Sequence, residues 1–202
     1  MIRDIMYIVL GYLCGSLLFA RISGELLLNR NITEDAPDKN PGTTNAFKAG
    51  GFRCGMMTLC GDMLKGFFPM FLYLRGEPSG VLALALMIAA PVVGHVFPVF
   101  FRFHGGKGIA TTFGCLLALF PNLLPAVLLA LFFLFFSLIL RIVPHYHRTL
   151  VTYICAEIAL FLLSDDPAVL IGFSLIVVTV TVRMLTSKEE KEPFEVSILW
   201  MH

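Results

Sequence analysis

Charged side chains are scarce in this sequence of 202 residues, since Asp, Glu, Lys and Arg together make up 14% of it. A soluble domain usually carries about 25%, so the polar surface that would coat a water-soluble globule is missing. The hydrophobic share of 57% and the mean hydropathy of +0.84 place the chain among integral membrane proteins. The charges nearly cancel to a net +1, which argues against a nucleic-acid partner held by bulk positive charge.

The sequence has five cysteines, and their positions show no metal-ligand spacing. We expect these side chains to be small buried apolar groups, with no metal site among them: Cys14, Cys54, Cys60, Cys115 and Cys155. The apolar run 5–20 lacks the basic start and the small-residue cleavage site of a signal peptide. It is interpreted as a first transmembrane helix.

Long apolar runs are what the sequence has in abundance. A spanning helix needs about 20 mostly apolar residues, and seven segments qualify: 4–23, 51–75, 79–101, 107–122, 123–142, 147–163 and 167–184. Residues 107–142 suit either a helical hairpin or a broken helix. The sequence therefore predicts an all-α, polytopic membrane protein with about seven spans, formed by one domain over 1–202 with a short tail at 185–202.

The basic residues predict how these spans are oriented. Lys and Arg lie in the 24–50 loop, the 102–107 turn, the turn around 141–148 and the tail, whereas Arg3, Arg75 and the acidic turn 164–167 belong to the other side. Lys and Arg concentrate on the cytoplasmic face of membrane proteins. We therefore expect the N-terminus outside and the C-terminus in the cytoplasm, which an odd number of spans requires.

The stretch GHVFPVFFRFHGGKGIATT (94–112) interrupts two apolar runs with a Gly-rich turn around Lys107. Glycines let backbone approach a ligand closely, successive amides form an anion-binding nest, and the helix that follows presents its N-terminal amides. Thr111 and Thr112 add hydroxyl groups. The turn is not a Walker A loop, because the glycine spacing differs. The alternative interpretation is a flexible turn with a snorkelling Lys107.

A second polar segment, NPGTTN (40–45), is expected on the same side of the membrane. Its Asn and Thr side chains either stabilise a turn or bind a polar ligand. In GDMLKG (61–66), Asp62 and Lys65 share one helix face at a spacing of three, and they form either a functional site or a structural ion pair inside the bundle.

Histidines and a lone acid complete the candidate residues. His95 is open to three roles: anion binding, general base catalysis, or a structural hydrogen bond between helices. We expect His145 and His147 to face water in a basic turn. Glu157 lies in the middle of an apolar run and needs a partner that the sequence does not identify.

The order GYLCGSLLFARI, NPGTTNAFKAGG, GDMLKGFFP and GHVFPVFFRFHGGKGIAT, over residues 5–120, resembles the bacterial acyl-phosphate:glycerol-3-phosphate acyltransferase (PlsY) family. The resemblance implies an enzyme of the bacterial plasma membrane that moves an acyl group from acyl phosphate to glycerol 3-phosphate, giving lysophosphatidic acid and phosphate. It implies a site facing the cytoplasm, no cofactor, no acyl-CoA, no metal and no protein nucleophile. The same resemblance implies membrane lipids and the enzyme that forms acyl phosphate as partners of the chain.

The resemblance makes Lys107 and Asn45 expected catalytic residues, and His95 joins them as the candidate from the sequence itself. The expected substrate-binding residues are Asn40, Gly42, Thr43, Thr44, Lys48, Asp62, Lys65, Gly105, Gly106, Gly108, Thr111 and Arg141. Lys48 stands where the family usually has Arg, a change that removes the bidentate fork.

Three differences from the family pattern bear on activity. Asp38 replaces a Ser and brings a negative charge near an expected phosphate, Pro144 replaces another Ser, and the family's C-terminal His-Arg-x-Asn motif is not recognisable. Two alternatives to a working acyltransferase therefore stay open. One is a catalytically altered or inactive paralogue, and the other is a membrane protein that binds or transports an anion or lipid.

Overall fold

The computed structural model describes residues 1–34, 40–187 and 195–198. Asp38 and most of the tail lie outside these ranges. The described chain is mostly helical, with the elements α1 (Ile2–Gly15), α2 (Phe19–Leu28), α3 (Thr43–Tyr73), α4 (Val81–Val96), the 3₁₀ helix η1 (Val99–Phe101), α5 (Ile109–Leu117), α6 (Leu124–Leu134), the π-helix η2 (Phe135–Ile139), β1 (Leu140–Val143), α7 (His145–Leu163), α8 (Pro167–Thr186) and β2 (Glu195–Ile198).

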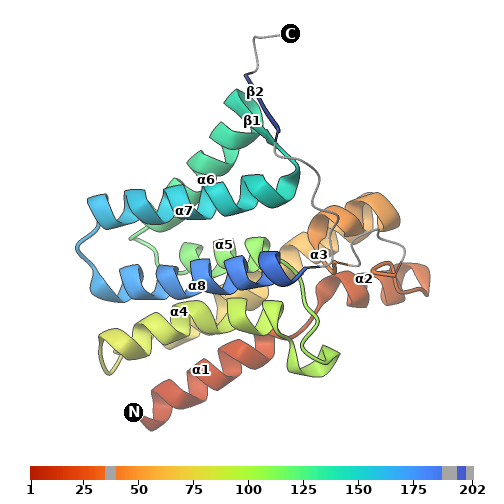
Figure 1. The fold of residues 1–202 in the computed structure, drawn as a ribbon. Coiled ribbons are helices and arrows are strands. Elements are labelled where there is room, and N and C mark those ends of the chain that lie inside the picture. The colour runs from red at the N-terminus through yellow and green to blue at the C-terminus, as the bar shows by residue number, and fades with distance from the viewer. Residues whose placement is uncertain (35–39, 188–194, 199–202) are drawn as a thin grey trace.

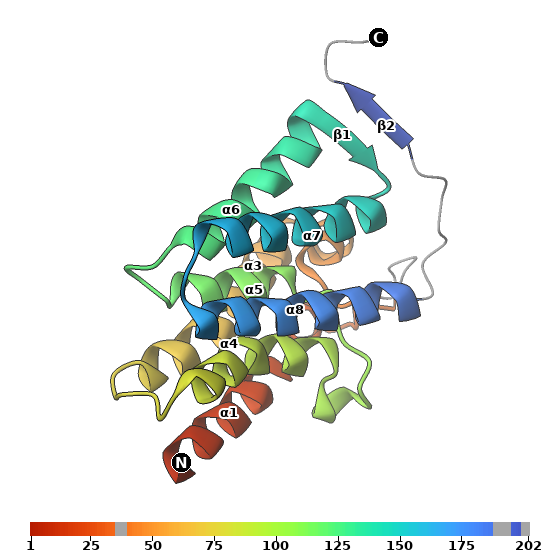
Figure 2. The same cartoon turned by 60° about the vertical axis from the view of Figure 1, so that its left-hand side comes forward.

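Five helices form a row in the order α1, α4, α8, α7 and α6 (Figure 1). Each contacts its neighbours in this row, while α3 and α5 pack against each other and against α1 and α4 respectively. Figure 2 shows the same order from a second direction. The buried core lies where α3, α4, α5, α7 and α8 meet.

One of the expected continuous spans is bent, and a second helix bends at the point where its expected span begins. The first segment divides at Ser16–Leu18 into α1 and α2, whose axes differ by 44°. The Ser16 hydroxyl donates to the carbonyl of Tyr12, a local bond that competes with the helix ladder. In α3 the bend lies at Gly51, whose φ of 74° only glycine adopts without strain. The bend at Gly51 sets the first turns of α3, from Thr43 onward, at an angle to the rest of the helix.

The segment 107–142 folds as two helices, α5 and α6, joined by a turn. α5 has only nine residues where 107–122 was expected to be helical. The helix that begins at Leu124 ends in the π-helix η2 and passes into strand β1. β1 pairs antiparallel with β2, with Leu140 opposite Ile198 and Val143 opposite Glu195. The expectation of a purely helical fold is therefore corrected by this short sheet, which ties part of the expected tail to the chain before α7.

Small residues let several helices approach closely. A Cβ at Gly15 of α1 would lie 2.1 Å from the carbonyl oxygen of Pro91 in α4, and one at Gly114 of α5 would lie 2.0 Å from that of Met63 in α3. Contacts of this kind are typical of helix packing in membranes, where no hydrophobic force drives helices together. They fix α5 against α3 and so position the start of α5.

The outer surface is strongly apolar. Large side chains such as Leu131, Ile158 and Val178 are 56%, 56% and 60% exposed, which water would disfavour and lipid would not. Among the described residues, 81–101, α7 and α8 are long and apolar enough to cross a membrane, and the bent pair α1 and α2 makes a fourth candidate. These features are those of a helical membrane protein.

Candidate active site

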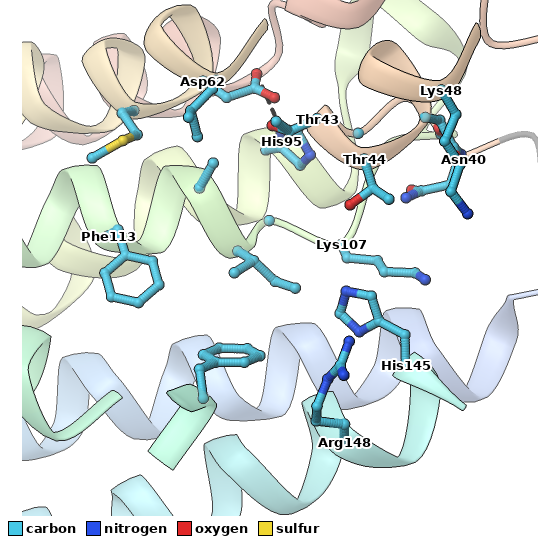
Figure 3. Close-up of a pocket in the computed structure, with 18 of the residues that line it drawn as sticks. Asn40, Thr43, Thr44, Lys48, Asp62, His95, Lys107, Phe113, His145 and Arg148 are labelled. Carbon is cyan, nitrogen blue, oxygen red and sulfur yellow. Dashed lines mark hydrogen bonds and ion pairs between the residues drawn. The ribbon is translucent and has the colours of Figure 1, made fainter. Parts of the chain in front are cut away.

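A cavity of about 440 Å³ opens at the end of the bundle where α3, α5 and α7 begin (Figure 3). Its polar lining comes from segments that are far apart in sequence: Asn40, Gly42, Thr43, Thr44, Asn45, Lys48, Asp62, His95, Lys107, Gly108, His145 and Arg148. The segments NPGTTN and GGKG, which the sequence predicts on one side of the membrane, are thus walls of the same cavity.

Three helix N-termini meet at this cavity. Gly42 precedes α3, Gly108 precedes α5 and Pro144 precedes α7, and none of these residue types has a side-chain acceptor that would cap the first amides. A helix N-terminus carries partial positive charge and points N–H groups outward. Together the three helix N-termini make the cavity suited to binding anions.

The segment NPGTTN (40–45), called the Asn-Thr loop below, is held by its own backbone and by one side chain. The Asn45 side-chain amide donates to the Asn40 carbonyl oxygen over 2.8 Å, and the Gly42 amide donates to the same oxygen over 2.9 Å. Asn45 therefore shapes the turn from which Thr43, Thr44 and Lys48 reach the cavity.

Behind the cavity, Asp62 and Lys65 form a buried ion pair. Lys65 Nζ lies 2.7 Å from Asp62 Oδ1, and both side chains are 2% exposed. Lys65 Nζ also lies 2.7 Å from Nδ1 of His95 and donates to the carbonyl of Leu17. The predicted pairing along α3 is confirmed, and its contacts extend to Leu17 in the link between α1 and α2 and to His95 of α4. Since the Lys65 charge offsets that of Asp62, the acid leaves little negative charge facing the cavity.

The GGKG loop is packed on His95. A Cβ at Gly105 would lie 1.9 Å from the His95 carbonyl oxygen, and one at Gly106 would lie 2.2 Å from Nε2 of the His95 ring. From α8, Arg183 donates through Nε (3.1 Å) and Nη2 (2.8 Å) to the Gly105 carbonyl oxygen. Gly105 and Gly106 are therefore needed for packing, and they direct Lys107 into the cavity.

The start of α7 forms a wall that sequence reasoning missed. His145 and Arg148 line the cavity from this helix and face Asn40, Thr44 and Lys107 across it (Figure 3). The expectation that His145 faces water in a basic turn did not include this place in the cavity wall. The spacing of three in PHYHR places both side chains on one helix face, which was the available signal.

The inner part of the cavity is apolar. Its lining includes Leu59 and Met63 of α3, Ile109 and Phe113 of α5, and Phe133 of α6, with Ser137 of η2 beside them. Phe113 lies away from the labelled cations (Figure 3). A ligand with a charged head and an apolar chain would match both parts.

Five of the expected site residues do not line this cavity. Lys65, Gly105 and Gly106 lie directly behind it. Thr111 is buried, and its hydroxyl has no hydrogen-bond partner among the described residues. Arg141 is exposed on β1 and lines a separate hollow with Glu195 of β2. No cluster of three His, Cys, Asp or Glu side chains in the described ranges is placed to hold a metal ion.

Comparison with known proteins shows which family this chain resembles. The family model described as glycerol-3-phosphate acyltransferase matches residues 5–190. A glycerol-3-phosphate acyltransferase of Legionella pneumophila is 44% identical over 120 residues, which are 56% of this chain and 40% of the relative. One from Burkholderia pseudomallei is 38% identical over 135 residues, 64% of this chain and 66% of the relative. The matches thus span less than two thirds of these relatives.

A solved structure shares the fold. The crystal structure of PlsY (YgiH), an integral membrane glycerol 3-phosphate acyltransferase in its glycerol 3-phosphate form, superposes with a TM-score of 0.74. The sequences are 28% identical, and the match covers 89% of this chain and 87% of the other. The family model covers nearly the whole chain and the fold agrees, so this chain belongs to the glycerol-3-phosphate acyltransferase family.

Proposed function

We propose that the chain transfers an acyl group from acyl phosphate to a hydroxyl of glycerol 3-phosphate, giving lysophosphatidic acid and inorganic phosphate. The observation that carries this proposal is the two-part cavity. Its outer part has three helix N-termini and the cations Lys48, Lys107 and Arg148, and its inner part is apolar. Acyl phosphate has a dianionic head and an apolar chain, and the acceptor brings a second phosphate.

The reaction needs few protein groups. The acceptor hydroxyl oxygen forms a bond to the acyl carbon, and the bond from that carbon to the phosphate oxygen breaks, so that inorganic phosphate leaves with its electron pair. The hydroxyl proton passes to a phosphate oxygen, that of the acceptor itself by the resemblance to the family. Lys107 and the first amides of α5 stabilise charge as it builds on the departing phosphate, an electrostatic contribution that is usually the largest.

Positioning supplies the rest of the catalysis. The hydrogen bonds of Asn45 hold the 40–45 turn, and those of Arg183 hold the GGKG loop that carries Lys107. Holding hydroxyl and carbonyl together in this way lowers the barrier through proximity. In this proposal Asn40, Gly42, Thr43, Thr44, Lys48 and Gly108 bind substrate, while Asp62, Lys65, Gly105, Gly106 and Thr111 support the binding walls.

An anion or lipid transporter fits the cavity less well. A transport path needs polar groups through the depth of the membrane, whereas the polar lining here is confined to one end and meets Phe113 and Met63 farther in. Glu157 of α7 is partly buried but is not among the cavity-lining residues. The one-sided site favours an enzyme that works from one face.

We also propose that the chain crosses a bacterial plasma membrane seven times, with the cavity facing the cytoplasm. The basic residues around the cavity support this orientation, and Asp4, Tyr73 and Ser79 are hydrogen-bonded at the opposite end. α5 would be a short crossing, about 13.5 Å long, covered by its neighbours. Cysteines placed at Glu77 and His104 in a cysteine-free variant test this. An impermeant maleimide should label Glu77→Cys but not His104→Cys in intact cells, and the reverse pattern would reject the orientation.

The activity is tested with purified protein in detergent. Acyl phosphate and glycerol 3-phosphate should give lysophosphatidic acid and inorganic phosphate in equal amounts, and acyl-CoA should give neither. Phosphate release that does not depend on glycerol 3-phosphate would indicate a hydrolase. A well-folded protein with no turnover on any acyl-chain length would support an inactive paralogue.

A further inference from the structure

Helix α8 supplies no side chain to the cavity lining. Its basic residue, Arg183, is engaged by the Gly105 carbonyl. The wall opposite the Asn-Thr loop is formed instead by α7, through His145 and Arg148. The basic side chains on this wall of the cavity therefore belong to α7 and not to α8.

Arg148 is placed to bind an anion. It is half-buried, and its Nε is buried without a hydrogen-bond partner among the described residues. A guanidinium N–H removed from water without an acceptor is costly, and a ligand oxygen would relieve this cost. The guanidinium also offers a planar fork that matches phosphate oxygens.

His145 is held beside Arg148 by a neighbour on the next turn. Its Nδ1 lies 2.8 Å from the Thr149 hydroxyl, and this hydroxyl also bonds the His145 carbonyl oxygen over 2.8 Å. A hydroxyl has one proton, so if it donates to the carbonyl, it accepts from Nδ1. The ring is thereby fixed on the cavity side of α7 (Figure 3).

We infer that Arg148, with His145, forms a second phosphate subsite, and that this subsite holds the phosphate of the acyl donor. This inference rests on the proposed function. The subsite is assigned to the acyl donor because the inner part of the cavity and the start of α7 are connected along one segment of the chain. Phe133 and Ser137 line the inner part of the cavity. Both lie on the segment that leads through β1 into α7. An acyl chain lying along that segment places its phosphate at the start of α7, and the acceptor then occupies the side of α3.

The charges of the cavity agree with two bound phosphates. Three permanent cations line it, and the acid Asp62 is paired with Lys65. The phosphate groups of glycerol 3-phosphate and of acyl phosphate together carry about three to four negative charges near neutral pH. One wall alone would leave the two phosphates to repel each other, whereas cations on both walls and Lys107 between them hold the phosphates side by side.

The kinetic test compares Arg148→Gln and Arg148→Lys with Arg102→Gln. Arg102 is an exposed basic residue outside the cavity lining and serves as the matched control. Arg148→Gln should raise KM for acyl phosphate about tenfold or more, the loss expected for a charge-assisted hydrogen bond, with KM for glycerol 3-phosphate changed less than twofold. Arg148→Lys should recover part of the loss, and Arg102→Gln should resemble the wild type. A rise in KM for glycerol 3-phosphate alone would overturn the assignment to the donor.

A binding test separates this inference from the proposed function. Calorimetry measures the binding of inorganic phosphate to the protein saturated with glycerol 3-phosphate, which fills the acceptor side. The wild type and Arg102→Gln should bind phosphate, and Arg148→Gln should bind it about tenfold more weakly. If the wild type shows no turnover but this difference holds, the proposed function fails and the subsite stands. Equal phosphate binding by wild type and Arg148→Gln would overturn the subsite whether or not the protein turns over.

Discussion

Lys65 Nζ lies 2.7 Å from Nδ1 of His95, while it is also paired with Asp62 at 2.7 Å. An ammonium group has donors only, so the charged Lys65 donates and Nδ1 accepts. A neutral His95 then carries its proton on Nε2, the nitrogen nearest the Gly106 position. His95 is arranged to donate a hydrogen bond at the GGKG loop, which favours its structural and anion-binding interpretations over that of a general base.

The Asp62–Lys65 pair should show non-additive effects on stability. Asp62→Leu or Lys65→Met alone leaves one charge buried without its partner, which costs about 3–5 kcal/mol. The double variant removes both charges and should be more stable than either single variant. Reversible unfolding in mixed detergent micelles measures the three free energies of unfolding. If the two single losses simply add in the double variant, the pair is not coupled as described.

Gly106→Ala should distort the loop that carries Lys107. The added methyl would lie 2.2 Å from Nε2 of His95, and such overpacking typically costs about 1–3 kcal/mol. We expect lower thermal stability and a lower kcat. Replacing His95 with Ala in the Gly106→Ala background makes room for the methyl. The loss of thermal stability in this double variant should therefore be smaller than the sum of the losses in Gly106→Ala and His95→Ala. A Gly106→Ala protein identical to the wild type would show that the ring does not limit the loop.

Arg183→Lys should lower activity without unfolding the protein. Arg183 reaches the Gly105 carbonyl oxygen with two nitrogens, a geometry that a lysine ammonium cannot reproduce. Loss of a charged hydrogen bond costs about 1.5–3 kcal/mol. We expect kcat/KM for glycerol 3-phosphate to fall at least tenfold, and further in Arg183→Gln. Steady-state kinetics on a monodisperse sample measures this, and full activity in both variants would remove the role assigned to Arg183.

Sequence reasoning identified the walls of the cavity that depend on local chemistry. The glycine, amide and hydroxyl groups of segments 40–45 and 104–108, with the alternation of spans, were enough to predict that the two segments lie together. The structure brings both to one cavity. The Asp62–Lys65 pair followed from helix periodicity, and the ion pair confirms it. The site roles themselves stay predictions.

Features that depend on tertiary contacts were not predicted. The bend at Ser16–Leu18 and the shortness of α5 are not visible in the apolar pattern of the sequence. The close contact of Gly114 with Met63 likewise depends on the packing of two helices. Arg141 matched the family pattern, but its strand turns it toward β2. Arg148 matched no pattern, and only the start of α7 beside the cavity gives it a role.

The most direct test of the central claim is the glycerol 3-phosphate-dependent formation of lysophosphatidic acid by the wild type and by Lys107→Ala. Lys107 lies between the two walls (Figure 3), where both phosphates would share its charge. Removing one preorganised electrostatic group of this kind lowers kcat by about 10²–10³, so Lys107→Ala should be reduced by at least that factor while remaining folded. Product formation at the wild-type rate by folded Lys107→Ala would contradict the account.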